Sequence, residues 1–329
     1  MVKYVIKRIL WMIPVLLGVL FLVFTINHFT PGDPVVNLLG SNYTQEQYDR
    51  KEAELGLDKP FLVQYVTYVW GIVTRFDLGT SYTSKRAVSD EIIERLPNTL
   101  KIGIWGVLSS IFIAIPLGVL AATHQGGVYD YVIRIGTIIL AALPNFWVAL
   151  MSIIIFSLKL GWFPASGLDS WKGWVLPVFS LAIGPIASVA RMTRSSMLEV
   201  IRQDYIRTAR AKGLKQSAVT RRHALKNGLI PVITVIGSQL SMIMGGSILV
   251  ETIYSVPGLG TLMNTAISSK NYPVVQSGIL VISITVCIMN LVVDLAYAFI
   301  DPRIKAQYTS GKKKKKEEEE PKPAAQEVA

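Results

Sequence analysis

The sequence predicts an all-α integral membrane protein with about six transmembrane helices, and three observations carry this prediction. Of the 329 residues, 51% are hydrophobic, and the mean hydropathy of +0.44 is typical of a chain surrounded by lipid. Mainly apolar segments of about 20 residues, the length that crosses a bilayer as a helix, recur along the chain. The largest cluster of basic residues outside the C-terminal tail falls into one connecting segment.

Six segments are long and apolar enough to span a bilayer, namely residues 9–29, 100–123, 133–158, 174–190, 229–250 and 278–300. The first has no small-residue cleavage site before the turn that follows it, so it is predicted to be an uncleaved anchor rather than a signal peptide. The fourth is the weakest because it carries Pro177, Gly184 and Pro185, although neighbouring helices can satisfy the carbonyls that a proline frees. Counts of five or seven spans stay open.

The distribution of lysine and arginine predicts the orientation in the membrane. Residues 191–228 carry ten Lys and Arg residues against two acidic residues, whereas the long segment 30–98 has a slight acidic excess. We therefore expect a multi-pass protein of the bacterial cell membrane, with residues 191–228 and both termini in the cytoplasm. The net charge of +11 is mostly this topology signal, so no nucleic-acid partner is expected.

The chain divides into three parts by pattern. Residues 1–96 are predicted to hold the first spanning helix and an external helical cap, and residues 97–298 to hold the remaining spans. Residues 299–329 contain a lysine run followed by a glutamate run, which predicts a disordered cytoplasmic tail. Helical spacing over residues 44–76 predicts that the cap has one packed apolar face, made of Leu55, Leu57, Phe61, Leu62, Tyr65, Val69 and Trp70.

Catalytic and metal-binding signals are absent from the sequence. There is no G-x-x-x-x-G-K-[ST] nucleotide loop and no G-x-S-x-G nucleophile motif. The three histidines, His28, His124 and His223, are far apart and form no ligand cluster, so no metal site is predicted. The sequence therefore predicts a chain that is not an enzyme.

A few residues inside the spans are candidates for the pore or for gating. Gly237, Ser241 and Gly245 recur every four residues, which predicts either close static packing or a helix that slides beside the pore, with equal weight. Ionisable residues within a membrane are costly and so are functional candidates, here Glu251 and Asp294. For Asp294, near one end of its span, structural pairing with another helix is the favoured interpretation.

The basic segment carries a motif that resembles a known family. Residues 204–214 (DYIRTARAKGL) and 223–231 (HALKNGLIP) resemble the cytoplasmic coupling loop of ABC importer permeases, in the version of the dipeptide, oligopeptide and nickel permeases. The resemblance implies docking on an ATPase subunit. The general Glu-Ala-Ala of the family is Arg-Thr-Ala here, as is common in the peptide branch. The residues predicted to dock are Arg207, Thr208, Ala209, Arg210, Ala211 and Gly213.

Further blocks resemble the first-permease branch of the same family and occur in its order. They are residues 76–81 (FDLGTS), 96–100 (LPNTL), 250–260 (VETIYSVPGLG), 272–276 (YPVVQ), 290–295 (NLVVDL) and 301–303 (DPR). The resemblance implies a type I ABC importer permease fold over residues 97–298. It also implies a pore-forming subunit of an ATP-driven importer of dipeptides or oligopeptides.

The resemblance further implies a set of partners. These are a second permease, two ATPases that bind ATP and magnesium, an external substrate-binding protein, the peptide substrate and membrane lipid. No cofactor is expected in this chain. Alternatives that stay open are a nickel or metal-chelate permease of the same family and an ion-coupled secondary carrier. A membrane-embedded enzyme is a further class, but it lacks a catalytic constellation.

Overall fold

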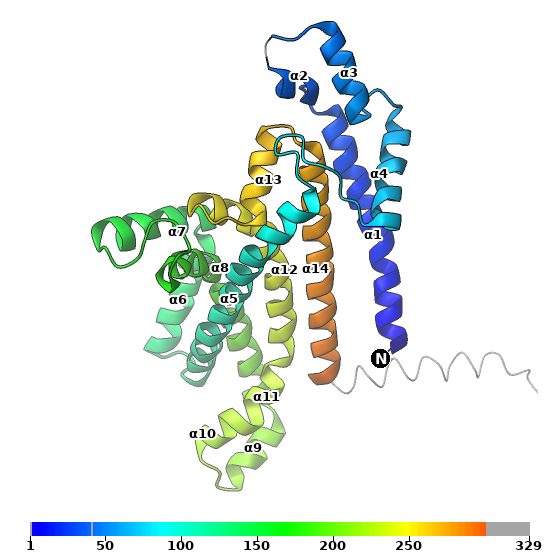
Figure 1. The fold of residues 1–329 in the computed structure, drawn as a ribbon. Helices are drawn as coiled ribbons and strands as arrows, with labels where there is room; N and C mark the ends of the chain where they lie inside the picture. Colours follow the sequence, from blue (N-terminus) through cyan, green and yellow to red (C-terminus); the bar gives the residue numbers. More distant parts are fainter. Residues whose placement is uncertain (1, 41, 301–329) are drawn as a thin grey trace, which may run out of the picture.

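The computed structural model describes residues 2–40 and 42–300, and this part of the chain is almost entirely helical (Figure 1). The helices before the loop at residues 160–170 are α1 (Val2–Phe29), α2 (Pro34–Leu39), α3 (Gln45–Leu55), α4 (Phe61–Arg75), α5 (Val88–Thr123), α6 (Val128–Ala142), α7 (Asn145–Ser152) and the π-helix η1 (Ile153–Lys159). Those after it are α8 (Trp171–Ile201), α9 (Asp204–Ala211), α10 (Gln216–Ala218), the π-helix η2 (Val219–Ala224), α11 (Leu225–Gly228), α12 (Ile230–Ile253), α13 (Leu259–Ser268) and α14 (Tyr272–Ile300). The predicted charged tail lies outside the described residues, apart from the end of α14.

Within the described residues, four helices are long and apolar enough to cross a membrane, and six spans result if each of two bent helix pairs counts as one. The predicted span 133–158 corresponds to one of these bent pairs. The chain bends there by 100° between α6 and α7. The break falls at Leu143, which adopts an extended conformation with ψ 123°, because the ring of Pro144 disfavours the helical conformation in the residue before it.

The fourth predicted span, residues 174–190, which the sequence marks as the weakest, lies in α8 at the centre of the bundle. α8 runs through Pro177 and Pro185 without ending, and 67% of its most apolar window is buried. It packs against α5, α6, α7 and α12, and these neighbours shield the backbone groups that the prolines leave free. α14 lies between α12 and α1 (Figure 1).

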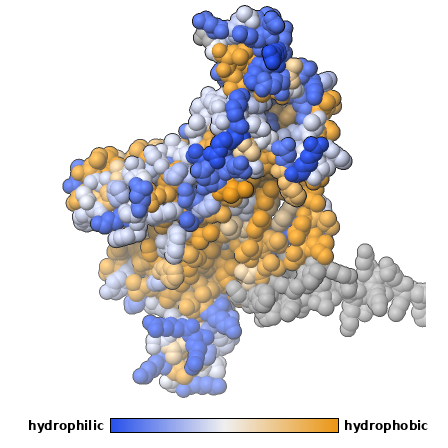
Figure 2. Space-filling model, viewed as in Figure 1, coloured by the Kyte–Doolittle hydropathy of each residue, from blue (hydrophilic) through white to orange (hydrophobic). Residues whose placement is uncertain are grey.

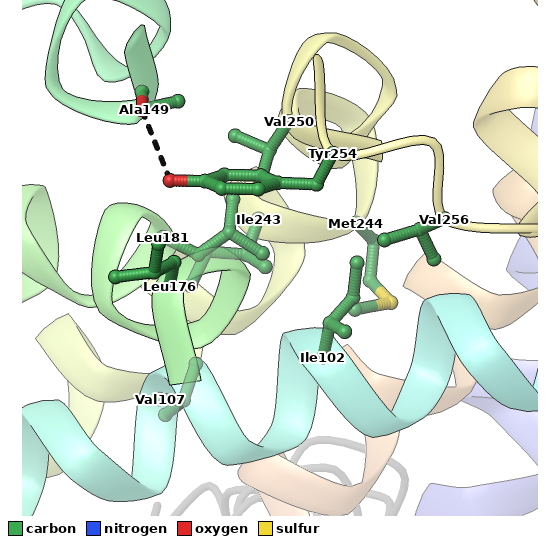
Figure 3. Packing of buried hydrophobic residues seen from close by; sticks show 10 residues of the cluster. All are labelled: Ile102, Val107, Ala149, Leu176, Leu181, Ile243, Met244, Val250, Tyr254 and Val256. Atoms are coloured by element: carbon green, nitrogen blue, oxygen red, sulfur yellow. Dashed lines mark hydrogen bonds between the residues drawn. The ribbon is translucent and has the colours of Figure 1, made fainter. Parts of the chain in front are cut away.

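The central core gathers around Tyr254, which is 1% exposed (Figure 3). Its ring packs among apolar side chains from α5, α8 and α12, including Leu176 and Ile243. Its hydroxyl donates to the carbonyl of Ala149 at 3.1 Å and lies 3.0 Å from the hydroxyl of Ser180. A buried tyrosine needs such partners, and here they join the segment after α12 to α7 and α8.

The two ends of the bundle differ. One end carries α2, α3, α4 and α13, and we call it the cap end; the other carries α9, α10 and α11, and we call it the loop end (Figure 1). α1 begins and α14 finishes toward the loop end. Figure 2 shows a broad apolar band between the two ends, with hydrophilic residues gathered on each. This arrangement suits a protein whose middle is surrounded by lipid.

The cap is helical, as the sequence predicts, but its packed face is smaller than expected. Phe61 and Tyr65 of α4 pack against Phe24 of α1, with ring centroids 5.4 and 5.5 Å apart. Leu62 and Trp70 were expected on the same face, yet each is 64% exposed. The predicted face was too wide because one helix in contact with α1 buries only a narrow stripe.

Candidate functional site

The basic segment forms a small helical subdomain, residues 202–229, that projects from the loop end (Figure 1). Residues 191–201, which the sequence assigned to the loop, belong instead to α8. After α9 the chain turns at Gly213, where φ is +76°. Glycine adopts this left-handed conformation without the steric cost that a Cβ would add, so the turn fits this residue type.

The subdomain has its own apolar interior. Ile206 and Ala209, three residues apart on α9, are 0% and 7% exposed and pack with Val219 and Ala224 against the end of α8. Ala209 therefore differs from the other residues predicted to dock. Its small side chain serves close packing within this chain rather than an outward surface.

The outer surface of the subdomain is basic. The other five residues predicted to dock are exposed, namely Arg207, Thr208, Arg210, Ala211 and Gly213. Around them, Lys212, Arg221 and Arg222 are also exposed. Arg207 lies 3.6 Å from Asp204, but both side chains are largely exposed, and such surface pairs contribute little. The outer surface of the subdomain is therefore exposed and strongly basic.

Three arginines tie the end of α8 and the start of the subdomain to α6 and to the turn between α5 and α6. Arg194 of α8 forms a bidentate ion pair with Asp130 of α6, with nitrogen–oxygen distances of 2.5 and 2.8 Å, and Asp130 is 1% exposed. Arg191 donates to the carbonyl of Thr137 at 3.1 Å, and Arg202 donates to a side-chain oxygen in the turn at 3.4 Å. The end of α8 and the first residue of the subdomain are therefore held against α6 and the turn before it.

The three small residues of α12 do not act as a unit. A Cβ added at Gly237 would collide with Val293 of α14, and Ser241 donates to Asn290 of the same helix at 2.7 Å. These two residues allow α12 and α14 to approach closely, which is the first of the two interpretations given above, close static packing. Gly245 instead is exposed, and an added Cβ there would meet nothing within 4 Å.

Gly245 belongs to an open face of α12. Exposed residues recur at intervals of three or four along the whole helix and include two large apolar side chains, Met242 and Leu249. The full face is Pro231, Thr234, Ser238, Met242, Gly245, Leu249 and Thr252. By contrast, α6 exposes Val132, Ile135, Ile138 and Ile139. The α6 surface is uniformly aliphatic, which is typical of lipid contact, whereas the α12 face mixes small, hydroxyl-bearing and apolar residues, which is typical of contact with another helix or of a path through the protein.

The two ionisable candidates have structural partners. Glu251 is 0% exposed and accepts hydrogen bonds from the backbone N–H groups of Gly260 and Thr261 at 2.6 and 3.3 Å, so its carboxylate holds the N-terminal end of α13. Asp294 forms an ion pair with Arg8 of α1. The favoured interpretation of Asp294 agrees with this geometry. Neither residue lies on the open face of α12.

Comparison with known proteins identifies the family. The model described as "Binding-protein-dependent transport system inner membrane component" matches residues 114–306, and the one described as "Binding-prot-dependent transport system membrane comp, N-term" matches residues 1–103. The chain belongs to this family. It is therefore a membrane component of a transport system, as the order of its motifs predicted.

Curated relatives match the permease along nearly its whole length. The dipeptide transport system permease protein DppB of Alkalihalophilus pseudofirmus is 40% identical and covers 93% of this chain and 100% of the relative. The oligopeptide transport system permease protein AppB of Bacillus subtilis is 39% identical, with 93% and 100% covered. DppB of Escherichia coli is 37% identical, with 93% and 99% covered.

A solved structure shows the same fold. The inward-facing MetNI methionine ABC transporter contains a chain with a TM-score of 0.56 and 19% identity to the permease. The match covers 65% of the permease and 97% of that chain. The expected ABC importer permease fold is thereby confirmed.

The sequence reasoning missed the residues that hold the site in place. Arg194 was assigned to the basic segment and Asp130 to no site, and only the pairing of Arg194 with the buried carboxylate of Asp130 shows their role. Blocks 96–100 and 250–260 were read separately, yet Asn98 donates to the carbonyl of Pro257 at 3.0 Å and Thr99 accepts from the N–H of Leu259 at 2.8 Å. The adjacent polar side chains of Asn98 and Thr99, next to an apolar segment, were an available signal.

Proposed function

We propose that the chain is one of two permease subunits of an ATP-driven importer of dipeptides or oligopeptides. The observation that carries this proposal is the match, over nearly the full length, to permeases named for dipeptide and oligopeptide transport. The partners are a second permease, two ATPases that bind ATP and magnesium, and an external substrate-binding protein. The loop end would then face the cytoplasm.

Uptake of labelled dipeptides and longer peptides tests the substrate class. Cells that lack this chain should lose ATP-dependent uptake, and the restored chain should recover it. Recovery of nickel-chelate uptake without peptide uptake would assign the chain to the metal-chelate branch. Uptake that follows an ion gradient and persists without the ATPases would instead indicate a secondary carrier.

The basic subdomain is the proposed docking surface for an ATPase. Arg207 and Arg210 are exposed on a helix whose inner side, Ile206 and Ala209, packs against the end of α8, so a docked partner would contact a helix that is anchored to the bundle. The surface charge suits an acidic groove on the partner. In the proposed cycle, the docked helix prefers different positions in the two access states of the permease.

Charge reversal tests this docking. Arg207→Glu with Arg210→Glu should abolish co-purification of the ATPases and peptide-dependent ATP hydrolysis, because like charges would meet at the interface. Arg75 is an exposed arginine at the C-terminal end of α4, in the cap. Arg75→Glu is the control and should retain co-purification of the ATPases and peptide-dependent ATP hydrolysis. Normal co-purification and normal transport by the double variant would exclude this surface as the docking site.

The open face of α12 is the proposed lining of the translocation path. Single cysteines at Ser238, Met242 and Leu249, in a Cys287→Ser background, should react with a polar thiol reagent at rates that change with ATP. A cysteine at Ile138, on the aliphatic surface of α6, should stay unreactive. Equal reactivity at all four positions would contradict this assignment.

A further inference from the structure

A groove of about 690 Å³ lies between the cap-end halves of α5 and α8. Lys101 and Trp105 lie one turn apart on the same face of α5, and Trp171 and Trp174 line it from α8. Trp105 and Trp171 are 56% and 71% exposed. Two large indole groups exposed beside a spanning helix pair indicate that another molecule covers this groove.

The lining changes from charged to apolar along the groove. α5 and α8 both run from the cap end toward the loop end (Figure 1). Lys101 and Asp169 therefore line the outer part of the groove, and Val178 lines its deeper part. The Lys101 ammonium lies 5.7 Å from the centre of the Trp174 ring, within the range of a cation–π contact.

This order of groups matches an amphiphile that lies parallel to the helices. The predicted spans begin at residues 100 and 174, so Lys101 and Trp174 lie where the apolar belt starts. Tryptophan is enriched at this level of a membrane, and lysine there can reach the phosphate layer. The charged end of the groove thus falls at the head-group level and its apolar end at the level of the acyl chains.

We propose that this groove binds one phospholipid with an amine head group, such as phosphatidylethanolamine, from the leaflet on the cap side. Lys101 meets the phosphate and Asp169 meets the amine, while an acyl chain covers Trp105 and Val178. The first two contacts pair opposite charges, and the third pairs apolar surfaces. The proposal is independent of the transported substrate.

A peptide fits the same groove poorly. Every peptide residue brings a backbone donor and acceptor, and each needs a partner when water is excluded. Below Lys101, the groove offers the hydroxyl of Ser109 and the ring nitrogens of its indoles as polar side-chain groups. An acyl chain needs no such partners, so the lining favours lipid.

Native mass spectrometry of the detergent-purified transporter complex tests this site. The wild-type complex should retain added phosphatidylethanolamine, and Lys101→Gln should lower this retention by about fivefold. Lys101→Arg should retain the lipid like the wild type, because this variant keeps the positive charge at position 101. Lys172→Gln removes an exposed neighbouring lysine that does not line the groove, and this control should retain lipid like the wild type.

A second measurement separates lipid binding from unfolding. Phosphatidylethanolamine with brominated acyl chains should quench tryptophan fluorescence in the wild type, and Trp105→Leu should remove part of that quenching while the complex still elutes as one species. Asp169→Asn should remove the preference for phosphatidylethanolamine over phosphatidylglycerol.

Three results would overturn the proposal. The first is equal lipid retention by the wild type and Lys101→Gln. The second is displacement of the lipid by a transported peptide, which would make the groove a substrate site. The third is loss of the second permease from the Trp105→Leu complex, which would make the groove a subunit interface.

Discussion

Replacing Arg194 with alanine should destabilise the loop end of the permease more than replacing the nearby Arg202 with alanine. Arg194→Ala leaves the carboxylate of Asp130, 1% exposed, with the N–H of Gly126 at 3.0 Å as its remaining partner. The matched control is Arg202→Ala, because Arg202 makes one exposed hydrogen bond of 3.4 Å to Gln125. Both variants remove one positive charge near the C-terminal end of α8, where Arg194 lies within the helix and Arg202 follows its last residue.

The structure sets the size of this effect. Removing one partner of a buried ion pair costs about 3–5 kcal/mol. The side chain of Arg194 is itself 21% exposed, so water compensates in part and the lower value, about 3 kcal/mol, applies. For a domain of about 200 residues, such as residues 97–298, that loss lowers the midpoint of thermal unfolding by about 6–12 °C. Arg202→Ala should cost less than about 1 kcal/mol.

A double-mutant cycle isolates the pair. Thermal unfolding of the purified complex is measured for Asp130→Ala, for Arg194→Ala and for both together. Two charge-assisted hydrogen bonds predict a coupling energy of about 2–4 kcal/mol, so the double variant should be little worse than either single one. A coupling energy under about 0.5 kcal/mol, or equal midpoints for Arg194→Ala and Arg202→Ala, would refute the reasoning.

Three further predictions concern packing and pairing inside the bundle. Gly237→Ala should cost about 1–3 kcal/mol because the added methyl collides with a valine of α14, whereas Gly245→Ala should be tolerated; equal unfolding midpoints would contradict the contrast. Tyr254→Phe removes two hydrogen bonds in the core and should cost about 1–3 kcal/mol, read from the same thermal assay, and an unchanged midpoint would count against this role. Arg8→Gln should loosen α1 and speed its proteolysis, while Arg8→Gln with Asp294→Asn should restore most of the protection; equally fast cleavage of both variants would exclude the pairing role.

The sequence alone determined the class of the protein and its family. The length and spacing of the apolar segments depend only on the cost of exposing polar groups to lipid, so they predicted the helices and most of the spans. The ordered motifs identified the permease family, and the basic segment identified the projecting subdomain. Pro144, the residue after Leu143, is the sequence signal for the bend in the third span. The continuous apolar content of residues 133–158 led to the prediction of one uninterrupted span there.

The tertiary structure decided what each of these residues contacts. Ala209 and Arg207 belong to one motif, yet one is buried in the subdomain and the other faces outward, because a helix has two sides and the motif does not say which is covered. Asp130 and Arg194 are 64 residues apart in sequence and bond only because α6 and α8 pack together. Gly237 and Gly245 share a spacing, but only Gly237 meets α14. Sequence spacing fixes the side of a helix on which a residue lies, whereas the neighbouring helix determines whether that side is core, lipid surface or site.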